Sequence, residues 1–134
     1  MYAGLILVIL MSVLVTAQES ATIGDFTRSH TEHIINQIGQ PFFVQSVKGV
    51  ISRQTTVAEP LSNVLFEIQG PGAERKIRRA ITNKDGHFKI EHVSAGSYAF
   101  KVTLEGFQSV MGTITVSKKA PKEEQIKITM LIGV

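Results

Sequence analysis

The sequence contains no cysteine and no tryptophan, and it has only two tyrosines in 134 residues. Without cysteine the chain has no disulfide, no thiolate metal ligand, no cysteine nucleophile and no lipid anchor attached through cysteine. Without tryptophan, and with Tyr98 as the only tyrosine after Tyr2, the chain has few of the aromatic platforms on which sugars stack. A domain of this composition depends on its apolar core for stability.

A strong charge of one sign is also missing. Fourteen Lys and Arg residues face 11 Asp and Glu residues, the net charge is +3, and the basic residues are spread from Arg28 to Lys127. Such a charge distribution, with so few aromatic residues for base stacking, does not indicate nucleic-acid binding. The length and the hydrophobic fraction of 43% are typical of one globular domain.

The N-terminus carries an apolar run from Leu5 to Val15, followed by the small residues of Val15-Thr16-Ala17. This pattern predicts a cleavable signal peptide over residues 1–17, a mature chain that begins at Gln18, and a secreted or periplasmic location. The run is shorter than the roughly 20 apolar residues that span a bilayer, so no stable membrane span is predicted. Because Met1–Gly4 contains no Lys or Arg, a buried core strand or helix at the start of the domain stays open as the alternative.

Residues 18–41 differ in pattern from the rest and are predicted to form a linker or a short helical arm. Ser29-His30-Thr31-Glu32 matches a capping box, and apolar residues follow at helical spacing. These features predict a helix from about His30 to Ile38. Gly39 would end it, and Pro41 would prevent its continuation.

From residue 42 to residue 134 the apolar residues alternate with polar ones, and turn residues recur at regular intervals. This pattern predicts an all-β domain of seven short strands folded as a sandwich. The strands are expected near residues 43–53, 61–69, 75–82, 88–91, 98–104, 110–116 and 126–132.

Three features refine this prediction. The strand at 98–104 alternates cleanly and should be central, whereas Arg79 shares a face with Ile77 and Ile81, which favours an edge position for the strand at 75–82. Asn83-Lys84-Asp85-Gly86 predicts a tight hairpin turn into the next strand. Phe88 and Tyr98 each open an alternating run after such a turn, so both should anchor the core.

Five segments in this order resemble the carboxypeptidase regulatory-like domains. They are Val47-Lys48-Gly49-Val50-Ile51, Pro60-Leu61-Ser62-Asn63-Val64, Thr82-Asn83-Lys84-Asp85-Gly86-His87-Phe88, Ala95-Gly96-Ser97-Tyr98 and Glu105-Gly106-Phe107. The resemblance extends from about Val47 to Ile132. It departs from the family pattern at Glu59, Asn63, Asn83 and Ala95, which are all turn positions.

The resemblance implies a seven-stranded Greek-key sandwich of the prealbumin-like or carbohydrate-binding-like type. Such domains occur beside metallocarboxypeptidase catalytic domains and in many secreted or outer-envelope bacterial proteins. The family carries no catalytic residues of its own, so we predict that the chain is not an enzyme and has no catalytic, cofactor-binding or metal-binding residue. The resemblance assigns structural roles to Gly49, Gly86 and Gly96, and places Phe88, Tyr98 and Phe107 in the core or at its rim.

Two clusters resemble metal sites but are better explained without a metal. His30 and His33 would lie one helical turn apart, yet no third or fourth ligand is near them in the sequence, so we interpret them as solvated residues. Asn83 and Asp85 supply only two oxygen ligands for a calcium loop, which needs several more. A turn in which their side chains bond to the local backbone explains them more simply.

One dense basic cluster remains, made of Arg75, Lys76, Arg78, Arg79 and Lys84. We expect it to protect an edge strand against aggregation. The alternative is an anionic ligand at this edge, such as an acidic glycan, a lipid headgroup or an acidic partner.

Taken together, these features of the sequence predict a secreted, non-enzymatic binding or structural module with a protein or cell-envelope partner. A glycan- or small-ligand-binding protein of the cell envelope is the rival hypothesis, and a metal-dependent hydrolase is a third.

Overall fold

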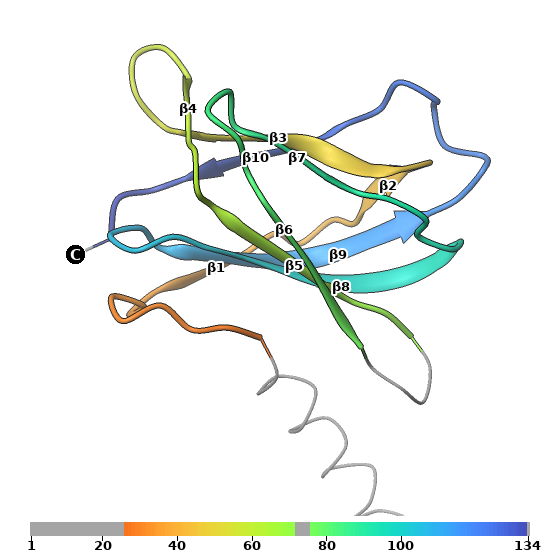
Figure 1. Cartoon of the computed structure of the whole chain (residues 1–134), viewed down its shortest axis with the longest axis horizontal. Coiled ribbons are helices and arrows are strands. Elements are labelled where there is room, and N and C mark those ends of the chain that lie inside the picture. Colours follow the sequence, from red (N-terminus) through yellow and green to blue (C-terminus); the bar gives the residue numbers. More distant parts are fainter. Residues whose placement is uncertain (1–25, 72–75, 134) are drawn as a thin grey trace, which may run out of the picture.

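The computed structural model describes residues 26–71 and 76–133, which form two β-sheets packed face to face (Figure 1). The larger sheet contains β1 (Ile35–Gln37), β2 (Phe42–Val44), β5 (Leu65–Gln69), β6 (Ile77–Ile81), β8 (Gly96–Thr103) and β9 (Ser109–Val116). The smaller sheet contains β3 (Val47–Arg53), β4 (Glu59–Pro60), β7 (His87–Ile90) and β10 (Ile126–Met130). The part of the chain that the structure describes is all β, which confirms the predicted sandwich.

Strand order in the larger sheet is β1–β9–β8–β5–β6, and β2 also pairs with β9. Strand β8 pairs antiparallel with β5 after β6 and β7 have intervened, which is the Greek-key return. As predicted, β8 is central and β6 lies at an edge. In the smaller sheet, β3 pairs in parallel with β10 and antiparallel with β4 and β7.

The seven predicted strands are present in the predicted order as β3 and β5 to β10, and β1, β2 and β4 are additional. The predicted strand at 43–53 is two strands, because the chain leaves the larger sheet after Val44 and enters the smaller one at Val47. At this crossing the side-chain amide of Gln45 donates to the carbonyl oxygens of Lys118 and Ala120, at 3.1 and 2.7 Å.

The Asn83–Gly86 turn forms as predicted, but the strands on either side of it do not form a hairpin. The N–H of Gly86 donates to the carbonyl of Asn83 at 2.9 Å, and Gly86 has a φ of 77°. However, β6 pairs with β5 and β7 pairs with β3, so this turn carries the chain from one sheet to the other. Local turn chemistry is visible in the sequence, whereas the strand that each arm joins is decided by tertiary packing.

The core lies between the sheets and consists of the residues that alternation placed inward. Phe66 stacks on Phe88 with ring centroids 4.1 Å apart, and its other neighbour Phe100 is 5.6 Å away. The buried cluster comprises Val44, Val47, Ile51, Val64, Phe66, Ile68, Phe88, Ile90, Phe100, Val102, Val110, Ile114, Val116, Ile126, Ile128 and Met130. Phe88 is therefore a core anchor, as predicted, while Tyr98 is half-buried at the rim and packs against this cluster.

The short helix predicted from His30 to Ile38 is not formed. The chain makes a turn at His30-Thr31 and then enters β1, which pairs in parallel with β9. The predicted capping box fails because the Glu32 carboxylate binds Lys101 and Ser109 of the larger sheet and does not cap a helix. Gly39 is not among the described glycines with positive φ, so the left-handed helix end predicted there is also missing.

The predicted export segment and Arg75 lie outside the described residues. Within residues 26–71 and 76–133, we find no helix that is long and apolar enough to cross a membrane.

Candidate functional site

Part of the outer face of the larger sheet is covered by the N-terminal arm, which we define as residues 26–41. Glu32 of the arm contacts the Lys101 ammonium at 2.6 Å and accepts a hydrogen bond from the Ser109 hydroxyl at 2.5 Å. The Glu32 and Lys101 side chains are only 3% and 4% exposed. Lys101 is central in the sheet and would face solvent without the arm, so this ion pair attaches the arm to the domain.

A second buried carboxylate lies beside it on β5. Glu67 is fully buried and accepts hydrogen bonds from the backbone N–H and the hydroxyl of Thr27, at 2.9 and 3.0 Å. The Arg79 guanidinium donates a further hydrogen bond to the Glu67 carboxylate, at 2.9 Å. Both carboxylates thus have their partners within the described structure, and the arm shields them from any external ligand. We interpret this face as structural.

The electrostatics of Glu32 follow from these contacts. Burial by itself raises the pKa of a carboxyl, but here the hydrogen bonds from Lys101 and Ser109 and the positive charge of Lys101 outweigh it. The pKa of Glu32 is therefore lowered, and the group is ionised at neutral pH.

His30 and His33 do not form a metal pair. His30 lies in a turn and His33 follows it, so the two do not share a helical face, and His30 Nδ1 lies 3.2 Å from Glu105. The backbone N–H of His30 donates to the same carboxylate at 2.9 Å, and this bond is the main reason why the pKa of Glu105 is lowered. Residues 26–71 and 76–133 bring no three His, Asp or Glu side chains together in a way that could hold a metal ion.

Asn83 and Asp85 form a turn of the kind predicted in place of a calcium loop. The Asn83 side-chain oxygen accepts hydrogen bonds from the backbone N–H groups of Asp85 and His87, at 2.9 and 3.1 Å. That oxygen is occupied by the local backbone, as in an Asx turn.

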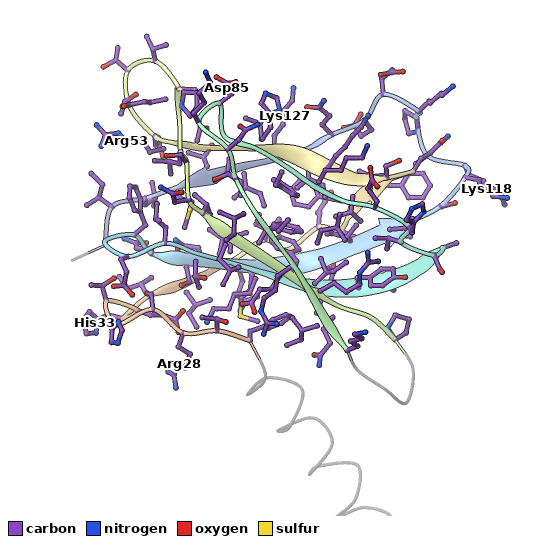
Figure 2. The ribbon with its side chains drawn as sticks, in the orientation of Figure 1. Arg28, His33, Arg53, Asp85, Lys118 and Lys127 are labelled. Carbon is purple, nitrogen blue, oxygen red and sulfur yellow. The ribbon has the colours of Figure 1, made fainter. Side chains whose placement is uncertain are left out.

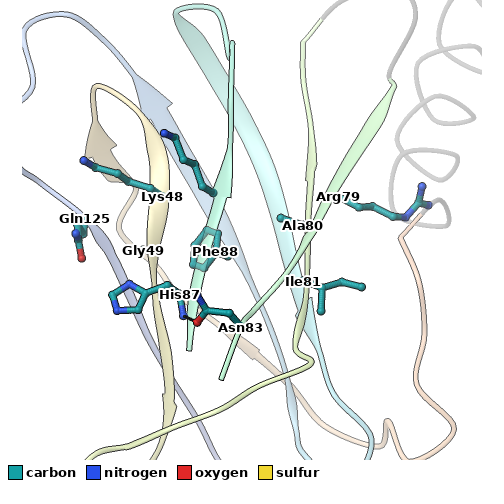
Figure 3. A pocket seen from close by; sticks show the side chains of 10 residues that line it. Lys48, Gly49, Arg79, Ala80, Ile81, Asn83, His87, Phe88 and Gln125 are labelled. Atoms are coloured by element: carbon teal, nitrogen blue, oxygen red, sulfur yellow. Dashed lines mark hydrogen bonds between the residues drawn. The ribbon is translucent and has the colours of Figure 1, made fainter. Parts of the chain in front are cut away.

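Two cations of the basic cluster around β6 form contacts within the protein. Arg79 binds the buried Glu67, and Arg78 donates to the carbonyl oxygens of Glu91 and His92 at 2.5 and 3.1 Å. These two cations therefore hold the edge strand in place. Figure 3 shows that the Arg79 side chain extends away from Lys48, and it is bound to Glu67.

A cleft opens between β6 and β7, where the two sheets meet along their unpaired edges (Figure 3). Its volume is about 580 Å³. We name it the β6–β7 cleft. It is lined by Lys48, Gly49, Arg79, Ala80, Ile81, Asn83, His87, Phe88, Lys89 and Gln125. None of these described lining residues is acidic, so the cleft carries a positive potential that favours an anionic ligand.

Two lysines of the cleft lie directly opposite each other. Lys48 on β3 and Lys89 on β7 are Cα partners in an antiparallel pair. Like charges in this arrangement repel and destabilise the pair. Glu91 lies 3.2 Å from Lys89 and partly offsets this repulsion. Because both side chains of that ion pair are more than half exposed, solvent weakens their attraction.

The excess of positive charge extends over the outer face of the smaller sheet. The described strands β3, β7 and β10 contain no Asp or Glu, while Lys48, His87, Lys89 and Lys127 all point outward by alternation with buried neighbours. Figure 2 shows Lys127 on this side of the molecule and Arg28 and His33 on the opposite side. Residues 26–41 of the arm do not lie over this face, and His87, Lys89 and Lys127 are exposed on it among the described residues.

The sequence does not reveal Lys48 and Lys89 as a pair, because they are 41 positions apart and belong to no cluster in the sequence. The outward alternation of each lysine was visible. Their opposition depends on the register between β3 and β7, and the turn before β7 had suggested a different partner strand.

Comparison with protein families gives one match, to the carboxypeptidase regulatory-like domain, over residues 46–130. The match begins at the crossing into the smaller sheet and ends with β10, so it leaves out the N-terminal arm and β2. No curated protein matches the chain. The matched segment contains strands β3 to β10 and all the residues that line the β6–β7 cleft. The chain belongs to the carboxypeptidase regulatory-like domain family.

Proposed function

We propose that this protein is a secreted, non-enzymatic binding module that holds an anionic ligand on the outer face of the smaller sheet. The observation that carries the proposal is the opposed pair Lys48 and Lys89 in a cleft without acidic lining residues. A bound anion would relieve the repulsion between the two lysines, so the free energy that this pair costs the unliganded fold would be recovered on binding.

Three observations support a binding role over catalysis. The matched family is non-catalytic. The buried Ser109, Lys101 and Glu32 are close together, but their side chains are covered by the arm, so no substrate reaches them. His87 lines the cleft, and none of the other described residues that line it carries a hydroxyl or thiol for His87 to activate.

The rival hypothesis is a protein that binds neutral glycans or small ligands of the cell envelope. Neutral sugars favour exposed aromatic rings, and the aromatic residue of the cleft, Phe88, is only 5% exposed. Tyr98 is half-buried, and its hydroxyl donates to the carbonyl of Ser94 at 2.7 Å. These positions favour the anionic ligand.

The test is binding of a polyanion and its neutral counterpart by the purified protein. We expect dextran sulfate to bind with an affinity that falls as salt rises, and neutral dextran not to bind. The double variant Lys48→Gln, Lys89→Gln should weaken binding about tenfold, since two exposed ion pairs contribute roughly 0.2–1 kcal/mol each and 1.4 kcal/mol is tenfold.

The matched control is Lys118→Gln, Lys119→Gln, which removes the same charge from an exposed loop at the end of the molecule (Figure 2). Equal losses for the two double variants would show that only net charge matters, and the site would be wrong. Selective binding of a neutral sugar on a glycan array would favour the rival hypothesis.

A further inference from the structure

The two strands that border the β6–β7 cleft both have a free edge. Among the described strands, β7 pairs only with β3 and β6 pairs only with β5. Their open edges face each other across the cleft (Figure 3). An unpaired strand edge is a row of backbone donors and acceptors that can accept another strand.

The register shows which backbone groups of β7 are directed into the cleft. The Ile51 N–H donates to the Gly86 carbonyl at 2.9 Å, and hydrogen-bonded and non-hydrogen-bonded pairs alternate along an antiparallel ladder. Lys48 and Lys89 therefore form a non-hydrogen-bonded pair. It follows that the N–H and C=O groups of Lys89 point away from β3 and toward the cleft.

Both ends of this open stretch are closed by contacts within the fold. At one end, the Asn83 N–H donates to the His87 carbonyl at 3.0 Å. At the other, Arg78 holds the carbonyl oxygens of Glu91 and His92. Between these two closures Lys89 offers its backbone, so the available edge is short and defined.

The side chains around the edge define the pattern of a strand that would pair with it. On the outer side are the ammonium groups of Lys48 and Lys89, and on the inner side the cleft is lined by Phe88 and Ala80. Successive side chains of a strand point to opposite faces. A strand laid along β7 would thus present every second residue to the lysines and the others to the side of the cleft where Ala80 and Phe88 lie.

We propose that the cleft binds an extended segment of a partner polypeptide as an added strand on β7, and that this segment alternates acidic with apolar residues. Main-chain hydrogen bonds to the N–H and C=O groups of Lys89 contribute affinity, and the alternating side chains contribute specificity. The inference rests on the proposed function, because the same lysines attract the ligand, and it narrows that ligand from any polyanion to a strand-forming acidic peptide.

The experiment compares peptides with identical side chains and altered backbones. The probe is acetyl-(Glu-Val)4-amide, and its two variants are N-methylated at all Glu or at all Val residues. In an extended peptide the N–H groups of the Glu residues point to one edge and those of the Val residues to the other. Each methylated variant therefore lacks the hydrogen-bond donors of one edge only. We expect at least one variant to lose binding tenfold or more, while acetyl-(Lys-Val)4-amide does not bind.

Loss by one methylated peptide supports pairing with β7 alone, and loss by both supports a strand that bridges β7 and β6. If both variants bind as well as the parent peptide, strand addition is wrong. Sensitivity of the parent peptide to Lys48→Gln, Lys89→Gln would then still support the anionic site. If the protein binds dextran sulfate and none of the peptides, the occupant is a polysaccharide and this inference fails. Binding of neither probe would overturn the proposed function as well.

Discussion

At some positions of this sandwich the residue type is determined by the close approach of a neighbouring strand, and at others by the backbone angle φ. A Cβ atom on Gly49 would lie 1.9 Å from the Ile126 carbonyl oxygen, so glycine is required where β3 and β10 pair. Asn63, at a position where the family often has glycine, has a φ of 62°, and asparagine is among the few other residues that tolerate that conformation. The departure from the family pattern thus preserves the turn.

Phe88 provides a test of the core at this scale. It is 5% exposed and stacks on Phe66, so we expect Phe88→Ala to lower the free energy of unfolding by about 3–5 kcal/mol. Urea denaturation followed by circular dichroism measures the change. Phe43→Ala is the matched control, because Phe43 is 45% exposed and its truncation should shift the midpoint little. Equal midpoints for Phe88→Ala and the wild type would contradict the strand register.

The sequence predicted these core residues well because alternation encodes which face of a strand is buried. It did not predict the opposition of Lys48 and Lys89, because register between distant strands leaves no mark on either strand alone. The candidate site therefore became visible only with the pairing of β3 and β7.

At the scale of elements, the N-terminal arm is where local pattern and tertiary structure disagree most. Ser29-His30-Thr31-Glu32 has the residues of a capping box, yet the chain there enters β1. Parallel pairing with β9 satisfies the backbone, and the ion pair with Lys101 takes the Glu32 side chain that would have capped a helix. A short helix is marginal by itself, so these tertiary contacts prevail.

The attachment of this arm should depend on pH through Glu32. Because its pKa is lowered in the folded state, the Glu32 carboxylate contributes stability above its unfolded pKa of about 4.3. That contribution is lost as pH falls through the lower folded value. We expect Glu32→Gln to cost on the order of 2 kcal/mol at pH 7, as for hydrogen bonds to charged groups, and the difference from wild type to shrink below about pH 4.

Urea midpoints measured between pH 7 and pH 3 for both proteins provide the comparison. Glu123→Gln is the control, since Glu123 is exposed in the loop before β10 and its substitution should have little effect at any pH. A difference between wild type and Glu32→Gln that stays constant down to pH 3 would mean that the carboxylate charge does not hold the arm.

For the molecule as a whole, the two outer faces have opposite character. The outer face of the larger sheet carries paired charges that the arm partly covers, whereas that of the smaller sheet carries an excess of positive charge that Glu59 and Glu91 only partly compensate. The fold class, the positions of the seven predicted strands along the chain and the family followed from the sequence, because they depend on alternation and turn chemistry. The difference in charge between the two faces depends on how the chain crosses between the sheets, and no local sequence pattern encodes those crossings.

The predicted export concerns the whole chain and is tested at its N-terminus. From the Leu5–Val15 run and the Val15-Thr16-Ala17 site we expect exported protein to begin at or near Gln18. N-terminal sequencing of protein recovered from the periplasm or the medium measures this directly. A soluble cytoplasmic product that retains Met1 would contradict the predicted signal peptide.

The pairing of early with late segments also affects when the protein can fold. Gly49 on β3 pairs with Ile126 on β10, and Ile35 on β1 pairs with Ser109 on β9, so each sheet needs a strand from near the end of the chain. Contacts of such high sequence separation slow folding, because the loop must close before the contact is gained. A nascent chain therefore cannot complete the larger sheet before β9 has been synthesised, or the smaller sheet before β10, which is almost the end of the chain.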